Sequence, residues 1–234
     1  PPAIEQPAGE KPEAKASSLR FLVNKIVLEG NNVIPTEVLE PLSKPHENRE
    51  QGMKELNELA QAIEQEYIRR GYITSIAYIP PQKVADGILK IRIVEGKVGE
   101  LQVEGNRYFR TKRILSYVKM KKGEILRYDG IQKATMRLNQ NPDREVRAVL
   151  KKGAAPETTD VIFKVTDRFP LHAGFMNDNQ GSDSSGKQRL GFTLRDSNLT
   201  GLDDTLYTGT IFGRHFGSVF TNYVFPVPQT DTKL

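Results

Sequence analysis

The sequence predicts an α+β protein in which two tandem β-α-α-β-β modules precede the first antiparallel strands of a transmembrane β-barrel. Three observations predict this class. A short segment recurs after 75 residues, amphipathic helices alternate with strands up to about residue 168, and alternating strands without helical periodicity follow. A repeat at a fixed offset indicates duplicated modules, and a change of hydrophobic period indicates a change of domain type.

The composition excludes several classes of protein. The chain has 234 residues, a net charge of +5, 37% apolar residues, 27% charged residues and no cysteine. The lack of cysteine excludes disulfides, thiolate nucleophiles and cysteine-based metal sites. No run approaches the roughly 18 apolar residues of a membrane-spanning helix, so a membrane role would depend on strands. The start at Pro1, without an initiator Met or a signal-peptide pattern, predicts a mature or trimmed product.

The first segment, residues 1–18, predicts a Pro-rich linker because it contains almost nothing to bury. The first module, residues 19–96, begins with a strand that is expected to place Leu22, Ile26 and Leu28 on one face. Apolar residues at helical spacing then predict an amphipathic helix that packs on this face. The expected elements are a strand over 21–29, helices over 36–39 and 53–70, and strands over 73–80 and 87–96.

The second module, residues 97–168, repeats the first. The segment IVLEGN at 26–31 recurs as LQVEGN at 101–106. The Gly-Asn pair that closes each copy tolerates positive φ, which predicts turns rather than ligand contacts. The expected elements of this module are a short helix near 111–114, a helix over 128–139, and strands over 145–151 and 160–166.

Each module is expected to expose the edge of a sheet. Two amphipathic helices cover one face of a three-stranded sheet, and if the first strand pairs beside the third, the second strand is left at the edge. An unpaired edge can bind extended polypeptide by strand addition, although edges also pack between modules or stay unused. The candidate edge residues are Ile73, Thr74, Ser75, Ile76, Ala77, Tyr78 and Ile79 in the first module, and Glu145, Val146, Arg147, Ala148, Val149 and Leu150 in the second.

The last segment, residues 169–234, changes character. It is rich in Gly, Asn, Ser, Thr and aromatic residues, and its strands alternate, as where Leu190, Phe192 and Leu194 are interleaved with polar residues and Gly. Such dyad alternation, apolar outward and polar inward, is typical of a membrane barrel wall. The expected strands cover 171–177, 187–195, 204–213 and 218–227.

These features in this order resemble a known family. The tandem modules joined by GILKIRIVEGKVGELQVEGN resemble the polypeptide-transport-associated (POTRA) domains of TpsB transporters, the ShlB/FhaC/HecB-like outer-membrane pores of two-partner secretion. The stretch NDNQGSDSSGKQRLGFTLRDSNLTGLDDTLYTG is similar to the start of that family's barrel. The resemblance implies a location in the outer membrane of a Gram-negative-type bacterium, with POTRA domains in the periplasm. It also implies a secreted exoprotein partner, contact with outer-membrane lipid, and no cofactor.

A basic cluster in the second module is a second candidate contact surface. It is expected to contact acidic exoprotein segments or anionic lipid headgroups, or else to be a solvated face, as charge runs usually are. A nucleic-acid partner is not expected, because there is no phosphate-binding loop, aromatic stacking pair or zinc module. The cluster consists of Arg107, Arg110, Lys112, Arg113, Lys119, Lys121, Lys122 and Arg127.

No catalytic or metal-binding constellation is expected. The histidines at 46, 172 and 215 lie far apart and show no metal-binding spacing. Asp203 and Asp204 are adjacent, so in a strand they would point to opposite faces, and a turn is the preferred location. Ser184 and Ser185 lack the surroundings of a nucleophile elbow. The chain is therefore predicted not to be an enzyme.

Three other functions stay open. One is an outer-membrane barrel-assembly factor of the same superfamily, which the resemblance disfavours because assembly factors commonly carry more than two POTRA domains. Another is a soluble POTRA-containing scaffold whose last segment is a small β-domain. The third is a basic nucleic-acid binder, which would show salt-dependent affinity.

Overall fold

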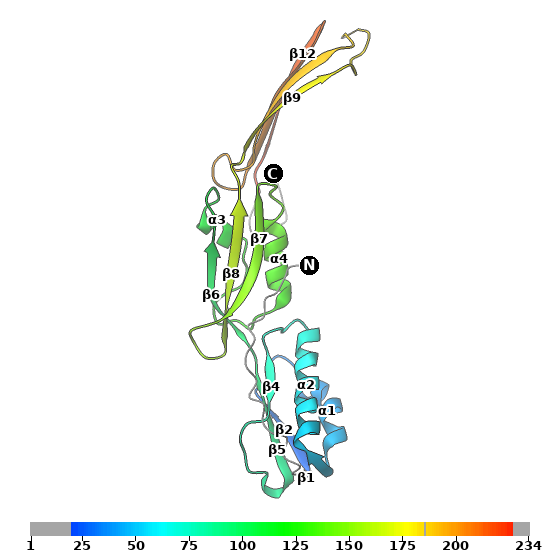
Figure 1. Cartoon of the computed structure of the whole chain (residues 1–234), viewed down its shortest axis with the longest axis vertical. Coiled ribbons are helices and arrows are strands. Elements are labelled where there is room, and N and C mark those ends of the chain that lie inside the picture. Colours follow the sequence, from blue (N-terminus) through cyan, green and yellow to red (C-terminus); the bar gives the residue numbers. More distant parts are fainter. Residues whose placement is uncertain (1–19, 185, 227–234) are drawn as a thin grey trace.

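The computed structural model describes residues 20–184 and 186–226 as an elongated chain of three parts (Figure 1). Two α/β modules lie end to end, and a four-stranded antiparallel sheet extends from the second. This arrangement confirms the predicted fold class. The predicted linker, residues 1–18, lies outside the described residues. Within those residues, no helix combines the length and the apolar character needed to cross a membrane.

The first module is built on a three-stranded sheet in the order β2-β5-β4. β2 runs parallel to β5 and β4 runs antiparallel to it. The two α-helices pack on one side of this sheet, where Leu39, Leu56, Ile63, Tyr67 and Ile91 are buried. The elements are β1 (Arg20–Val23), β2 (Lys25–Glu29), α1 (Thr36–Ser43), η1 (Lys44–His46), β3 (Arg49–Gly52), α2 (Met53–Arg69), β4 (Ile76–Tyr78), η2 (Ala85–Gly87) and β5 (Ile88–Val94).

The expected first strand is divided in two. It breaks at Asn24, whose backbone N–H donates to the Gly87 carbonyl over 2.8 Å. β1 then leaves the main sheet and pairs with β3. Because of this break, the prediction for Leu22 is wrong: Leu22 is 53% exposed, and its neighbour Val23 is the residue that enters the core.

The predicted edge of the first module is shorter than expected. Only Ile76, Ala77 and Tyr78 pair with β5. Residues 73–75 form a turn, because Gly71 has a φ of 89° and the Ser75 N–H donates to the Tyr72 carbonyl over 3.1 Å. The strand prediction was therefore wrong for Ile73, Thr74 and Ser75, and also for Ile79, which lies beyond the strand and packs against the first core.

The second module repeats this plan with longer strands. Its sheet has the order β6-β8-β7, with β6 parallel and β7 antiparallel to β8. Its core includes the buried side chains of Phe109, Ile114, Leu126, Leu138 and Phe163. The elements are β6 (Lys97–Glu104), α3 (Thr111–Leu115), α4 (Tyr128–Leu138), β7 (Arg144–Lys152) and β8 (Thr158–Asp167).

The sequence repeat produces the same turn twice. Gly30 and Gly105 have φ values of 94° and 86°, and a Cβ would lie 2.2 Å from the Ile93 carbonyl oxygen at the first and 2.4 Å from the Val165 oxygen at the second. The following asparagine donates its side-chain amide to a carbonyl three residues on and to a threonine hydroxyl five residues on, in both copies. The predicted role of these residues as turn formers is confirmed.

The last part is an antiparallel sheet in the order β12-β11-β10-β9. One of its faces exposes Leu190, Phe192 and Leu194 of β10. Phe212 and Phe175 stand opposite Leu190 and Phe192 on the neighbouring strands, so an apolar face extends across the sheet. The elements are β9 (Leu171–Asp178), β10 (Arg189–Asp196), β11 (Thr205–Gly213) and β12 (Phe216–Val224).

Candidate functional site

The strand β7 is a free edge of the second module. It pairs with β8 through nine consecutive residues, and no other strand of the described chain lies on its far side. All six predicted edge residues, 145–150, lie in it. The exposed side chains of Glu145 and Arg147 pair with each other over 2.7 Å, which neutralises charge in the half of the strand near the last sheet. Of the two predicted edges, β7 offers the longer one.

The edge of the first module is more restricted. β4 has three residues, and Pro80 and Pro81 follow shortly after it. Beyond its end, the side-chain amide of Gln82 takes the place of a strand. It donates to the Lys90 carbonyl over 2.7 Å and accepts from the Lys90 N–H over 2.9 Å. The first module therefore offers little edge for a partner.

A shallow depression lies beside β7, between this strand and α4. Its lining is mostly apolar and brings together residues of both modules. Ile73, predicted as an edge residue of the first module, packs here against the second core instead. The residues that line the depression include Ile73, Tyr128, Ile131, Thr135, Ala148 and Leu150.

The same turn that carries Ile73 connects the modules. The Tyr128 N–H at the start of α4 donates to the Gly71 carbonyl over 2.9 Å. The Arg127 guanidinium lies 5.6 Å from the centre of the Tyr72 ring, within the range of a cation–π interaction. These contacts place the end of α2 directly against the start of α4.

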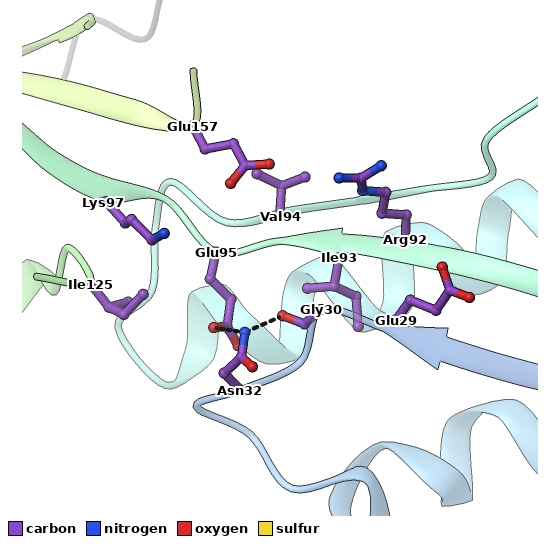
Figure 2. A pocket seen from close by; sticks show the side chains of 10 residues that line it. All are labelled: Glu29, Gly30, Asn32, Arg92, Ile93, Val94, Glu95, Lys97, Ile125 and Glu157. Atoms are coloured by element: carbon purple, nitrogen blue, oxygen red, sulfur yellow. Dashed lines mark hydrogen bonds between the residues drawn. The ribbon is translucent and has the colours of Figure 1, made fainter. Parts of the chain in front are cut away.

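A hollow of about 420 Å³ lies on the module boundary (Figure 2). Its wall has mixed charge, with Glu29, Arg92 and Glu95 from the first module and Lys97 and Glu157 from the second. Glu95 is not free to bind a ligand, because its carboxylate accepts hydrogen bonds from the Val33 N–H over 2.8 Å and the Tyr67 hydroxyl over 2.9 Å. Burial, and then the Glu95 carboxylate, raise the pKa of Tyr67, so the phenol stays a donor.

The second module has an equivalent carboxylate. Asp167, at the end of β8, accepts hydrogen bonds from the backbone N–H groups of Tyr108 and Phe109 over 2.9 and 3.1 Å. Glu95 and Asp167 therefore both hold the turn that precedes the first helix of their module. The sequence interpretation missed this pair because the side chains differ and lie outside the conspicuous repeat.

The structure divides the predicted basic cluster. The Lys122 ammonium binds Glu100 at the start of β6, near the first module. At the other end, the Arg113 guanidinium donates to the Pro226 carbonyl over 2.8 Å, and the Arg110 guanidinium lies against Gly201. The residues of the cluster thus do not form one surface, and two of its arginines contact the last segment of the chain.

A buried polar network joins the second module to the turn between β10 and β11. At its centre is Asp143, which is 1% exposed. Its carboxylate accepts hydrogen bonds from the Ser197 hydroxyl, from Arg168 Nε over 2.6 Å and from His172 Nε2 over 2.8 Å. Asn141 adds a bond from its amide to the Ser197 carbonyl over 2.8 Å. We call these residues, with Arg144 and Asp203, the junction network.

Arg144 forms the second half of the junction network. Its side chain is fully buried and donates to both carboxylate oxygens of Asp203, over 3.0 and 3.3 Å. It also donates to the Leu138 carbonyl at the end of α4 over 2.7 Å and stacks 4.8 Å from the centre of the Phe109 ring. Asp203 has a φ of 65°, which confirms the predicted turn. One guanidinium thus connects α4, the core and the last sheet.

Electrostatics favour the ionised form of the network. Burial by itself would raise the pKa of Asp143, but the hydrogen bonds from Ser197, Arg168 and His172 outweigh it, so the pKa is lowered below 3.8. Asp204 in the same turn behaves alike, because bonds from Thr200 and Tyr223 overcome its burial and lower its pKa. Both carboxylates are charged acceptors at neutral pH. They are structural, and no group of three or more potential metal ligands occurs among residues 20–184 and 186–226.

Two family models match the chain. Residues 21–96 match the model described as "POTRA domain, ShlB-type", and residues 157–216 match "Haemolysin secretion/activation protein ShlB/FhaC/HecB". Together they cover the first module and the passage from the second module into the last sheet. These two matches confirm the resemblance of the chain to ShlB/FhaC/HecB proteins.

Relatives of known name show the same resemblance. The chain is 27% identical over 192 residues to the Heme/hemopexin transporter protein HuxB of Haemophilus influenzae, covering 80% of this chain and 34% of that protein. It is 29% identical over 157 residues to the Outer membrane transporter CdiB of Dickeya dadantii, covering 67% of this chain and 28% of that protein. The chain thus spans about a third of the length of these relatives.

A solved structure shows the same fold. CdiB from Escherichia coli matches 97% of this chain and 47% of its own length with a TM-score of 0.72 at 20% identity. The match extends through the modules and the last sheet. The fold of this chain is therefore that of POTRA domains joined to the strands of a barrel wall.

Proposed function

We propose that this chain is the periplasmic receptor and first barrel segment of an outer-membrane transporter for two-partner secretion. The two POTRA domains bind an extended segment of a secreted exoprotein, and the last sheet belongs to the pore wall, with its apolar face toward lipid. The observation that carries this proposal is the direct connection of two POTRA domains to the antiparallel sheet, in a chain that matches both ShlB-type models. The activity is binding and conduction, and no catalytic step is involved.

The geometry of β7 supports capture by strand addition. An added strand forms main-chain hydrogen bonds that do not depend on the sequence of the cargo, while its alternate side chains pack over the neighbouring apolar depression. The predicted site residues of β7 are accordingly proposed as the receptor, and β4 contributes less. Arg107, Lys112 and Lys121 remain candidates for contact with acidic cargo or headgroups, whereas Arg110 and Arg113 have a role inside the chain.

A depletion experiment in the native bacterium tests this proposal. We expect loss of the complete transporter to abolish release of one exoprotein into the medium while the other outer-membrane barrels keep their abundance. A barrel-assembly factor would give the opposite pattern, with many barrels reduced together. Quantitative mass spectrometry of the medium and of the outer-membrane fraction distinguishes the two outcomes.

A further inference from the structure

We infer that the peptide site of the second module is confined to the half of β7 nearest the first module, where it accepts a short extended segment of the exported polypeptide. The inference rests on the function proposed above and makes it more specific. Four features carry it: a side chain that covers one part of the edge, unpaired backbone groups in the other part, a buried hydroxyl without a partner, and a residue supplied by the first module.

Asn139 covers the half of β7 near the last sheet. Its side-chain amide donates to the Val146 carbonyl over 2.9 Å and accepts from the Val146 N–H over 2.6 Å. Both backbone groups of Val146 are therefore already bonded on the side away from β8. Arg144 lies two residues nearer the last sheet, so its backbone groups face the same way as those of Val146. Its N–H is also already bonded, because it donates to the Asn141 carbonyl. No further strand can pair with this half while these bonds exist.

The other half of the edge is open. Successive residues of a strand direct their N–H and C=O groups to alternate sides, so Ala148 and Leu150 face the same way as Val146. The register with β8 shows no bulge between residues 144 and 152. Within the described chain, no hydrogen bond reaches the outward backbone groups of Ala148 or Leu150. Both residues line the depression, so these groups lie beside its apolar floor.

Thr135 supplies a polar group inside the depression that the fold does not use. The residue is 7% exposed, and its hydroxyl has no hydrogen-bond partner in the structure. The equivalent helical position of the first module, 75 residues earlier, is Ala60, which is also buried. Packing at this position therefore needs no hydroxyl. A buried hydroxyl beside unpaired backbone groups is suited to bonding the backbone of a bound peptide.

The first module closes the site at one side. Ile73 lies in the turn after α2, packs against the second core and lines the depression together with Ile131 and Leu150. The site is therefore composite, and its shape depends on both modules. A peptide side chain that packs over the shallow depression would contact Ile73 of the first module and Ile131 of the second at once.

The charge beside the open half identifies the occupant. Lys152 is exposed at this end of β7 on the same face as Ala148 and Leu150, whereas Lys151 projects from the other face, opposite Asp160 of β8. Glu145 and Arg147 at the covered end neutralise each other. The structure thus suits an extended segment with alternating apolar residues and an acidic residue at the end that lies beside Lys152.

Disulfide trapping tests the inference, because the chain has no cysteine of its own. The variants Lys151→Cys and Glu145→Cys place one thiol on the same face of β7, at the open end and at the covered end. The probe is a blocked synthetic peptide of alternating Thr and Val residues with one central Cys and one terminal Glu. With the full chain in mild detergent, we expect roughly tenfold more adduct at position 151 than at 145, as the loss of one or two backbone hydrogen bonds implies.

Three further variants separate the site from general stability. Thr135→Ala, which installs the residue of the first module, is expected to lower trapping at position 151. Thr135→Ser, which lacks the same methyl group but keeps the hydroxyl, is expected to restore trapping at the melting temperature of Thr135→Ala. Asn139→Ala is expected to raise trapping at position 145. Equal trapping at positions 145 and 151, unaffected by the Thr135 and Asn139 substitutions, would overturn the confined site and leave edge capture in place. The lack of any adduct at either position would overturn edge capture itself.

Discussion

The substitution Asp143→Ala removes the acceptor at the centre of the junction network. In the native chain its carboxylate receives three side-chain hydrogen bonds, from Ser197, Arg168 and His172. The three donors differ in their access to water. Ser197 is 0% exposed, whereas the side chains of Arg168 and His172 are 66% and 41% exposed.

This difference sets the size of the effect. Arg168 and His172 can bond to water after the substitution, so each contributes about 0–1 kcal/mol, as exposed pairs do. The buried Ser197 hydroxyl would lose its acceptor, which costs about 1–3 kcal/mol. We therefore expect the turn between β10 and β11 to lose about 1–5 kcal/mol of local stability.

Native-state hydrogen exchange measures this loss. The reporters are the Ser197 N–H, which donates to the Pro170 carbonyl, and the Asp203 N–H, which donates to Asn198 Oδ1. A loss of about 1–5 kcal/mol corresponds to exchange that is roughly 5- to 4,000-fold faster. The control is Asp129→Ala, which removes an exposed surface pair in α4 and is expected to leave both amides unchanged. Equal exchange in Asp143→Ala and in the native chain would refute the assigned role of Asp143.

Three further predictions follow from the same structure. The pKa of Asp143 is lowered from 3.8, so the stability that it contributes is present above that value and is lost only as the pH falls through the lower folded pKa. Protection of the 197–204 turn from hydrogen exchange should therefore be constant from pH 8 to 5, and a midpoint near pH 6 would contradict this. Gly105→Ala and Gly123→Ala both place a side chain at a φ of 86°, but only at Gly105 does the new Cβ meet a carbonyl oxygen, at 2.4 Å. Chemical denaturation should therefore show a loss of unfolding free energy that is larger by about 1–3 kcal/mol for Gly105→Ala. Equal losses in the two variants would count against the tight turn. Tyr67→Phe removes a buried donor to Glu95 and should cost about 1.5–3 kcal/mol in the first module, whereas Tyr78→Phe at an exposed tyrosine should cost almost nothing.

The repeat and the hydrophobic periods were sufficient to predict the order of the elements. The helical spacing of α2 and α4 and the apolar positions of β8 arise from burial of one face, and the alternation in β10 gathers its exposed apolar residues on one face of the sheet. A sequence records both patterns directly. β3 could not be predicted in this way. Its four residues, REQG, are polar and have no alternation, and they form a strand only because β1 lies beside them.

The limits of β4 and the junction network depend on contacts between distant segments. The segment 73–80 has strand composition throughout, but Ile73 is drawn into the second core, and residues 73–75 turn to bring it there. Asp143 and Asp203 lie 60 residues apart, and both interact with buried polar partners. The only local signal was the polar run Asn141-Pro142-Asp143-Arg144 between a helix and a strand, which is also typical of an ordinary loop.

The central claim is that the edge strand of the second POTRA domain receives the exported polypeptide. Photo-crosslinking in the native bacterium tests it most directly, with a crosslinking amino acid at Lys151 of β7 or at Met136, which is 64% exposed on α4. In the complete transporter, co-expressed with its exoprotein, we predict an exoprotein adduct from position 151 that disappears when export is not under way, and little from position 136. Adducts from Met136 with none from Lys151 would contradict capture by strand addition.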